Sequence, residues 1–253
     1  MDLEMAPLLS IVIPTYNEKE NIGVLAEKIF NCTHSAGMET EIIVVDDNSP
    51  DGTAQYAESL DKRYNVRVIK REGKLGLSSA VIRGWEESTG EILGVIDADL
   101  SHDTAILPDM IYSITHGGAD IAMGSRYIKG GGVENWPWFR RITSLAAVVM
   151  GWLICPVNDV TSGYMLMKRS VFQEVAPRLD PIGFKINLEV LVKGNYKTVT
   201  EVPFIFRDRQ KGNSKFNGKE IYNYLIHLAK LTKYWFTHFT KHTKINYTPF
   251  PRQ

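Results

Sequence analysis

Cysteine is scarce in this sequence: Cys32 and Cys155 are the only two among 253 residues, and they lie far apart. Disulfide frameworks and cysteine-ligated zinc sites require paired spacings, so the sequence argues against both and favours a reducing, cytoplasmic environment. An excess of charge is also absent, because 29 Lys and Arg residues balance 29 Asp and Glu residues. A nucleic-acid partner is therefore not expected, and any charge-driven function must be local.

Long apolar runs are missing as well. No stretch of about 18 unbroken apolar residues indicates a transmembrane helix. The N-terminal "MDLEMAPLLSIVIP" has acidic residues before its apolar run, unlike a secretory signal peptide. The most apolar stretch, "ITSLAAVVMGWLICPV" at 142–157, is short and ends next to Pro156. We expect it to form a buried helix, and the alternative is a helix that lies at a membrane interface.

Glycine-rich phosphate loops are a third absence. Neither G-x-G-x-x-G nor G-x-x-x-x-G-K-[ST] occurs in the sequence, so the backbone cradle of dinucleotide-binding and ATP-binding proteins is not expected. Any bound phosphate must therefore be held by a metal ion and basic side chains.

Apolar, β-branched runs do recur, and they alternate with helix-like segments at 20–36 and 76–89. The runs are "LLSIVIP", "EIIVVDD", "VRVIK", "EILGVIDAD" and "ADIAMGS". This alternation predicts an α/β fold whose mostly parallel sheet is flanked by helices on both faces. Ligands of such sheets bind beyond the carboxyl ends of the strands, where polar residues follow each run. We expect residues 1–217 to form the domain that carries the site, and 218–253 to form an amphipathic helix and tail.

The acidic stretch "VIDADLSHD" at 95–103 follows the fourth run. Asp97 and Asp99 are two residues apart, so on an extended strand end both carboxylates point to the same side. A divalent cation relieves their repulsion, and Mg²⁺ or Mn²⁺ completed by substrate phosphates suits oxygen ligands. The alternative is a solvated turn in which Ser101 and Asp103 cap the helix that follows.

Several stretches between Ser10 and about Leu231 resemble the family 2 glycosyltransferases of the GT-A fold, and in particular the dolichol-phosphate mannose synthases. They are "IVIPTYNEKENI", "EIIVVDDNSPDGT", "LGLSSAVIRGW", "VIDADLSHD", "MGSRYIKGGGV", "DVTSGYMLMKR" and "FRDRQKGNSKF". The resemblance implies a Rossmann-like GT-A domain and a metal-dependent, inverting transfer of mannose from GDP-mannose to dolichyl (polyprenyl) phosphate. The product, dolichyl β-D-mannosyl phosphate, would supply mannose for protein glycosylation or glycolipid synthesis.

The same resemblance implies roles for individual residues on the donor side. The residues that would hold the guanine nucleoside are Pro14, Tyr16 and Glu18, with Val45 and Asp47 beside the base. Those that would meet the nucleotide and the metal are Asp97, Ala98 and Asp99, with Ser101 as a further candidate metal ligand in place of the Gln of some relatives. The basic positions that would grip phosphate are Arg126, Arg209 and Lys215.

On the acceptor side, "WFRRITSLAAV" resembles a family stretch that approaches the acceptor phosphate, which casts Arg140 and Ser144 in that role. The chain departs from the family after Ser144, where "LAA" stands in place of a frequent Arg-Gly-Ala-Asn. The turn with Asp159, Thr161, Ser162 and Gly163 fits a structural role as well as a catalytic one. We interpret Glu189 as an ordinary helix-face glutamate, with an acceptor-side acid as the alternative.

A phosphate acceptor changes the chemistry that the site must perform. A phosphate monoester has a second pKa near ~6 and is largely ionised at pH 7, so its attack needs no general base. We expect direct, inverting displacement by the lipid phosphate oxygen, with Arg126 and Arg140 orienting the two phosphates. A cation held by Asp99, together with Arg209 and Lys215, would stabilise the charge that builds on the departing diphosphate.

The C-terminal stretch 218–244 has the pattern of an amphipathic helix. Its polar side would carry Lys219, Asn223, His227, Lys230, Thr237 and Lys241, and its apolar side Ile221, Leu225, Leu228, Trp235 and Phe239. Aromatic and basic residues in this arrangement suit a membrane surface, and docking on the domain is the alternative. We expect a peripheral protein on the cytoplasmic face of a membrane, of the type without its own anchor, which leaves room for a small membrane-anchoring subunit.

Two other functions remain open at this point. A polyprenyl-phosphate glucosyltransferase that uses UDP-glucose shares the fold and the paired aspartates. A non-catalytic protein that binds a nucleotide sugar or a lipid would keep the scaffold without the reaction, and the intact acidic and basic positions argue against it.

Overall fold

The computed structural model describes residues 8–180, 185–207, 218–238 and 246–247. The strands of the central sheet are β1 (Leu9–Thr15), β2 (Thr40–Asp46), β3 (Val66–Lys70), β4 (Ile92–Val95), β5 (Ile121–Ser125), β7 (Met165–Lys168), β8 (Thr198–Pro203) and β10 (Asn246–Tyr247). Within the described residues they form one sheet of eight strands in the order β10-β8-β5-β7-β4-β1-β2-β3. Every neighbouring pair is parallel except the pairs of β7, which runs antiparallel to β4 and β5. The predicted mostly parallel sheet is thus confirmed.

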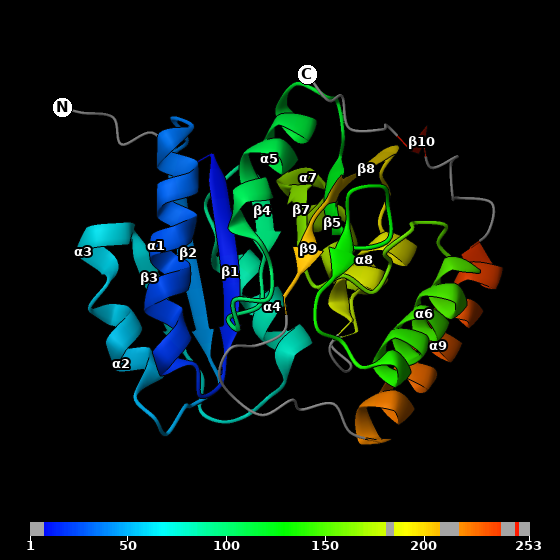
Figure 1. Ribbon diagram of the computed structural model, residues 1–253, viewed down its shortest axis with the longest axis horizontal. Helices are drawn as coiled ribbons and strands as arrows, with labels where there is room; N and C mark the ends of the chain where they lie inside the picture. Colours follow the sequence, from blue (N-terminus) through cyan, green and yellow to red (C-terminus); the bar gives the residue numbers. More distant parts are fainter. Residues whose placement is uncertain (1–7, 181–184, 208–217, 239–245, 248–253) are drawn as a thin grey trace.

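Helices cover both faces of the sheet (Figure 1). One face carries α1 (Lys19–Ser35), α2 (Thr53–Glu58), α3 (Asp61–Tyr64) and α5 (Leu107–Thr115). The other carries α4 (Leu77–Glu87), α7 (Arg169–Val175) and α8 (Ile186–Lys193). Alternate strand residues supply the two cores: Ile11 and Ile13 pack on the first face and Val12 on the second. Because both faces are buried, the strands read as continuous apolar runs.

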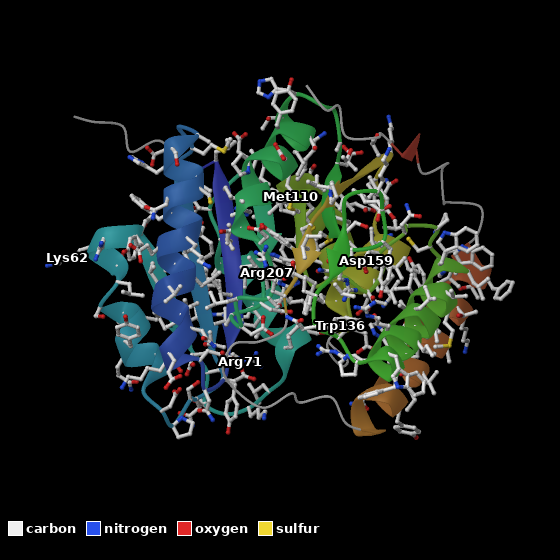
Figure 2. All side chains as sticks on the ribbon, viewed as in Figure 1. Lys62, Arg71, Met110, Trp136, Asp159 and Arg207 are labelled. Atoms are coloured by element: carbon white, nitrogen blue, oxygen red, sulfur yellow. The ribbon has the colours of Figure 1, made fainter. Side chains whose placement is uncertain are left out.

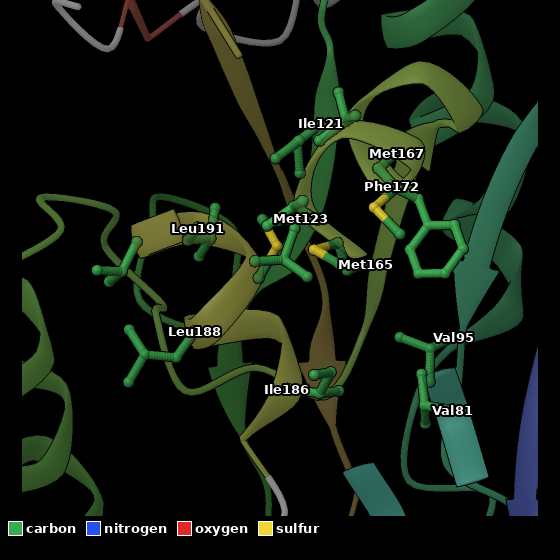
Figure 3. Close-up of a cluster of buried hydrophobic side chains, with 14 of the residues drawn as sticks. Val81, Val95, Ile121, Met123, Met165, Met167, Phe172, Ile186, Leu188 and Leu191 are labelled. Carbon is green, nitrogen blue, oxygen red and sulfur yellow. The ribbon is translucent and has the colours of Figure 1, made fainter. Parts of the chain in front are cut away.

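The core beneath α4, α7 and α8 is dense and aromatic in part (Figure 3). The Trp85 ring meets the Phe172 ring edge-on at 5.5 Å between centroids, and its Nε1 donates to the Gly94 carbonyl. Burial of an apolar side chain of this size contributes about 2 kcal/mol. Gly84 lies directly against Val12, so a Cβ at this position would clash and α4 would have to move away from β1.

Strand register brings three loops to one edge of the sheet. Thr15 pairs with Asp46 in the β1–β2 ladder, and Val12 pairs with Val95 in the β1–β4 ladder. The segments after β1, β2 and β4 therefore leave the sheet side by side, at the edge that the arrowhead of β2 marks in Figure 1. The sequence predicted the candidate site at this edge.

Two further helices, α6 (Trp138–Trp152) and α9 (Gly218–His238), lie next to each other beyond α8 (Figure 1). The Tyr224 hydroxyl on α9 donates to the Ala147 carbonyl on α6 at 2.7 Å. On its inner face α9 buries Tyr224, His227 and Leu231. Docking of α9 on the domain is thus observed, and His227, which the helical pattern assigned to a polar side, lies inside.

The buried-helix prediction for 142–157 is wrong. The helix begins earlier, at Trp138, and only Val148 and Gly151 within it are buried. We call its large exposed apolar side chains the α6 apolar face: Trp138, Phe139, Ile142, Leu145, Val149 and Trp152. Apart from Thr143 and Ser144 the stretch is apolar, so its sequence did not reveal that only a narrow stripe contacts the domain. Among the described residues, no helix is both long and apolar enough to span a membrane.

Candidate active site

Asp46 joins the loops that follow β1 and β2. Its carboxylate accepts hydrogen bonds from the Thr15 hydroxyl at 2.9 Å and from the Ser49 hydroxyl at 2.6 Å, and Ser49 accepts one from the Asn17 backbone N–H at 2.9 Å. Asn17 and Asn48 both adopt left-handed backbone angles, with φ of 59° and 58°. Asparagine tolerates this region better than most residues, which accounts for its presence in "PTYNE" and "DDNSPDG". The two loops form one fixed wall of the site.

Asp47 and Arg71 form a buried ion pair at the same edge. The Arg71 Nη1 lies 3.1 Å from Asp47 Oδ1, and the Gly76 N–H donates to Oδ2 at 2.9 Å. Nearby, the Lys74 ammonium lies 4.0 Å from the centroid of the Tyr16 ring. The sequence analysis did not identify Arg71 or Lys74. Arg71 directly follows the third apolar run, so the expectation that ligands bind beyond the carboxyl ends of strands could have identified it.

The other predicted nucleoside residues lie on or just after β1 and β2. Pro14 pairs with Val45 in the ladder, and the Val45 side chain is fully buried in the core, so only its backbone is available to a ligand. The Glu18 carboxylate accepts from Asn21 Nδ2 at 2.8 Å, and the Glu18 N–H donates to the Thr53 hydroxyl at 3.0 Å. Strand ends thus bring the five predicted positions to one region.

Asp97 and Asp99 follow β4, as predicted. Asp99 is buried, and its Oδ1 accepts from the Ser101 N–H at 3.1 Å, whereas the Asp97 side chain keeps 35% of its surface exposed. Leu100, between Asp99 and Ser101, has a φ of 62°, an unfavourable angle for a bulky residue. Asp103 caps the short 3-10 helix Thr104–Ile106 by accepting a hydrogen bond from the Ala105 N–H. The capping role that we considered for Asp103 is therefore observed, and it does not involve Asp97 or Asp99.

The donor set after β4 fits a hard divalent cation. Two carboxylates are present, and the hydroxyl of Ser101 is buried without a hydrogen-bond partner in the structure. Oxygen ligands of this kind suit Mg²⁺ or Mn²⁺ when substrate phosphates complete the shell. In the part of the chain that the structure describes, no group of three or more His, Cys, Asp and Glu side chains gathers into a protein-only metal site.

His102 and Gly163 close the site behind Asp97. The His102 Nδ1 lies 4.0 Å from Asp97 Oδ2, and the ring packs among Tyr164, Phe204 and Phe206. Burial lowers the pKa of His102. A Cβ on Gly163 would come within 2.9 Å of Asp97 Oδ2, so the glycine leaves room for that carboxylate.

Arg126, directly after β5, is held by the turn that contains Asp159, a residue labelled in Figure 2. Its Nε and Nη2 each donate to the Asp159 carboxylate at 2.7 Å, and Nη2 also donates to the Thr161 hydroxyl at 2.9 Å. Burial alone would lower the pKa of Arg126, but Asp159 and, more weakly, Asp97 raise it above its ordinary value. The turn "DVTSG" therefore positions a permanently charged guanidinium near the acidic strand end.

Lys185 is a second cation in this region, and the sequence analysis did not single it out. Its Nζ donates to the Thr161 carbonyl at 2.7 Å. Burial, followed by the charge of Arg126, lowers the pKa of Lys185 to about 8, while Asp97 and Asp159 act in the opposite direction. Its sequence context, "GFKINLE", gave no signal of this environment.

The predicted acceptor residues gather around Trp136, just before α6. The Arg140 guanidinium lies over the Trp136 ring at 4.3 Å, and that of Arg126 lies 5.6 Å from the same centroid. The Tyr127 hydroxyl donates to the Ser144 hydroxyl at 2.9 Å. Arg126, Arg140 and Ser144, which come from separate motifs, thus meet in one cluster with Trp136 and Tyr127.

Glu189 is not the helix-face glutamate that we expected. It is fully buried, accepts hydrogen bonds from Lys193 and from the Asp180 N–H, and its Oε2 lies 3.3 Å from His227 Nε2 on α9. Burial tends to raise the pKa of Glu189, but these partners lower it overall. The glutamate links α8 to α9. The predicted phosphate residues Arg209 and Lys215 lie outside the described residues.

Comparison with known proteins gives consistent results. Residues 10–176 match the family model "Glycosyl transferase family 2". The chain is 46% identical over 230 residues to a dolichol-phosphate mannosyltransferase of Pyrococcus furiosus, a match that covers 89% of this chain and 64% of that protein. It is 37% identical to the protein of the same name from Saccharomyces cerevisiae, over 88% of this chain and 86% of the yeast protein.

A solved structure shares the fold at lower sequence identity. A mannosyltransferase from Pyrobaculum calidifontis in complex with GDP-Man and Mn²⁺ has a TM-score of 0.64 and 16% identity, over 96% of this chain and 67% of that one. Together with the strand-end geometry, these matches show that the chain belongs to glycosyl transferase family 2, among the dolichol-phosphate mannosyltransferases.

Proposed function

We propose that this chain transfers mannose from GDP-mannose to the phosphate of a dolichyl or related polyprenyl lipid, with inversion at the sugar carbon. The observation that carries the proposal is that Asp97 and Asp99 follow β4, while the guanidinium of Arg126, fixed by Asp159, lies close enough to Asp97 for that carboxylate to raise the Arg126 pKa. The names of the Pyrococcus and yeast relatives support the two substrates. GDP-Man and Mn²⁺ in the Pyrobaculum enzyme support the donor and a divalent cation.

On the donor side, the nucleoside would lie over the end of β1 and β2. Tyr16 offers a ring face, and the Asp47 carboxylate, fixed by Arg71 and the Gly76 N–H, can accept hydrogen bonds from the base. A guanine base presents N–H donors that suit a carboxylate acceptor. Because Arg71 holds Asp47 before the donor arrives, little side-chain freedom is lost on binding.

Asp97, Asp99 and the Ser101 hydroxyl would hold Mg²⁺ or Mn²⁺ next to the donor diphosphate. The cation, when bound, supplies positive charge that stabilises the leaving GDP. Leu100, with its left-handed backbone, turns the chain between Asp99 and Ser101. The lack of space for a Cβ at Gly163 preserves the position of Asp97.

On the acceptor side, the residues of the chain orient an anion that is already a nucleophile. A phosphate monoester is largely ionised at pH 7, so the site needs no general base. The acceptor phosphate must approach the donor diphosphate, and the two anions repel each other. Arg126 and Arg140 provide positive charge near Trp136 that offsets this repulsion. The sugar centre would carry oxocarbenium character, as in other glycosyl transfers.

A lipid substrate requires contact with a membrane, and the α6 apolar face supports such contact. Trp138, Ile142, Leu145, Val149 and Trp152 recur at helical spacing, and Trp138 is 75% exposed. On α9, Tyr222, Leu225 and Phe236 are also exposed. An exposed apolar stripe with aromatic residues suits an interfacial helix. We place the protein at the cytoplasmic face of a membrane, with room for a small anchoring subunit.

The proposed reaction is tested by the configuration of its product. Purified protein with GDP-mannose, short-chain dolichyl phosphate and Mn²⁺ should yield a β-linked mannosyl phosphate, identified by the anomeric carbon–hydrogen coupling. An α-linked product would contradict direct displacement. UDP-glucose in a parallel reaction distinguishes the glucosyltransferase alternative, and failure to release GDP in the presence of acceptor would favour a protein that only binds.

A further inference from the structure

Trp136 carries a polar group that the structure leaves without a partner. The residue is 7% exposed, and its Nε1 is buried with no hydrogen-bond acceptor among the described residues. Buried donors in native proteins are nearly always paired, and leaving one unpaired costs roughly 1–3 kcal/mol. By contrast, the indole N–H of buried Trp85 donates to the Gly94 carbonyl at 3.0 Å. The unpaired N–H of Trp136 therefore calls for an acceptor from outside the chain.

The surroundings of Trp136 select a negatively charged acceptor. The guanidinium of Arg140 lies 4.3 Å from the ring centroid and that of Arg126 lies 5.6 Å from it, so two cations contact one indole. Phe206 packs edge-on against the same ring at 5.2 Å, which fixes its orientation. An unpaired indole N–H on a ring that contacts two guanidinium groups suits the oxygens of a phosphate, because charged donors and N–H groups both bind them.

The beginning of α6 adds a second favourable feature. Trp136 stands directly before Pro137, the N-cap of this 15-residue helix, and Pro137 makes no side-chain capping bond. The first N–H groups of an α-helix have no partners inside the helix and favour anions. The start of α6 thus directly follows Trp136 in the chain, and Arg140 in its first turn contacts the Trp136 ring.

We propose that Trp136 is a ligand of the acceptor phosphate, whose Nε1–H donates to a non-attacking oxygen of the phosphate monoester. The inference rests on the proposed function for the identity of the acceptor. Both Arg126 and Arg140 lie within cation–π distance of the Trp136 ring, so the indole also helps to position the two guanidinium groups. No bond is made or broken at Trp136; the residue binds and orients the nucleophile.

Two matched substitutions test the role of the N–H. Trp136→Phe keeps an aromatic ring next to the arginines but removes the donor, and Trp235→Phe makes the same change on α9, where the ring contacts Phe236. A hydrogen bond to a charged group contributes about 1.5–3 kcal/mol, so Trp136→Phe should raise the KM for dolichyl phosphate roughly tenfold or more and leave the KM for GDP-mannose unchanged. Unchanged acceptor KM, or a rise confined to GDP-mannose, would overturn the proposal.

A binding measurement separates this inference from the proposed function. The chain has five tryptophans, and the indole N–H signal of Trp136 in a ¹⁵N-labelled protein is identified by its loss in Trp136→Phe. Farnesyl phosphate should shift that signal downfield, whereas farnesol should not. If farnesyl phosphate binds and shifts only other indoles, the proposal is wrong. If the Trp136 signal responds but no mannosyl lipid forms, the anion site stands and the proposed reaction fails.

Discussion

Arg126 and Asp159 form a buried, two-pronged ion pair that crosses 33 positions in the sequence. The pair is tied to the sheet, because the Asp159 N–H donates to Glu201 Oε1 on β8 at 3.0 Å. The Arg126 side chain is 8% exposed and that of Asp159 is fully buried. A guanidinium fixed in this way presents its remaining N–H groups to a ligand without losing side-chain freedom on binding.

Asp159→Asn should therefore damage both stability and the phosphate site. The substitution leaves a buried guanidinium without its counter-charge, and breaking such pairs costs about 3 kcal/mol or more. We expect a lower free energy of unfolding in denaturant titrations and a higher KM for the lipid phosphate. Asp120→Asn, in the partly exposed pair with Lys168, is the matched control with a smaller effect. Equal losses in the two variants would contradict a special role for the Arg126–Asp159 pair.

Lys185 should lower the free energy of unfolding at neutral pH while it contributes to activity. Its folded-state pKa of about 8 lies below the ordinary value of 10.5, so the unfolded chain binds more protons between these values. The free energy of unfolding should consequently rise as pH increases from about 8 to 10.5, and the cost of holding the charged lysine is fully present below pH 8.

Lys185→Met should accordingly raise the Tm at pH 7 and abolish the rise in stability above pH 8, while lowering activity. Thermal unfolding across pH, with Lys168→Met as a partly exposed control, measures the effect. A Tm at pH 7 that falls in Lys185→Met would show that the lysine stabilises the fold instead.

Glu189 should matter for the attachment of α9. Glu189→Gln leaves Lys193 and His227 next to a neutral amide inside the protein. The free energy of unfolding should therefore fall by about 3 kcal/mol. The pKa of Glu189 is lowered from 4.5, so the stabilisation is present at neutral pH and is lost as the pH falls below 4.5 through the folded-state pKa.

The stability difference between wild type and Glu189→Gln should thus shrink in acid. Denaturant titrations at pH 7 and at decreasing acidic pH follow this change. Glu174→Gln, in an exposed i,i+4 pair with Arg178, should change stability by only a few tenths of a kcal/mol. A difference that is independent of pH would rule out the ion pair as its cause.

Leu145→Glu should weaken binding to lipid vesicles. Leu145 is 52% exposed at the centre of the α6 apolar face, so a charge there costs little in folding but opposes insertion into the interface. We expect vesicle affinity to fall by roughly tenfold or more in sedimentation with liposomes. Tyr112→Glu, at an exposed aromatic residue on α5, should bind as wild type does. Similar losses in both variants would indicate a general charge effect.

The sequence was sufficient for the first five strands of the sheet and for the position of several strand-end residues, whereas β7, β8 and β10 were not predicted. Buried parallel strands leave continuous apolar runs, so the ends of β1, β2 and β4 and the residues Asp47, Asp97 and Asp99 could be placed before the structure was known. Periodicity says nothing about which partner a polar group finds across the fold. The Arg126–Asp159 pair and the Glu189–His227 contact depend on tertiary packing. The sequence separation of the two residues in each pair predicts neither contact.

Local context was misleading at α6 and gave no signal at Trp136. The apolar residues of α6 do not by themselves indicate which stripe packs inward, and the structure shows that most of the large ones face outward. The sequence analysis did not single out Trp136 in "NWPWF", because the arginines near its ring come from the residue after β5 and from α6. Its proposed role rests on an unpaired N–H, which a sequence cannot show.

The central claim is tested most directly by mass spectrometry of the lipid product in a pair of single-carboxylate variants. Asp99→Asn removes a charge from the predicted metal and donor site, whereas Asp103→Asn changes an acid four residues away that caps a 3-10 helix. With GDP-mannose, short-chain dolichyl phosphate and Mn²⁺, wild type and Asp103→Asn should both form mannosyl-phosphoryl lipid, and Asp99→Asn should lose about a hundredfold in rate. Full activity of Asp99→Asn, or no mannosyl lipid from wild type, would contradict the account.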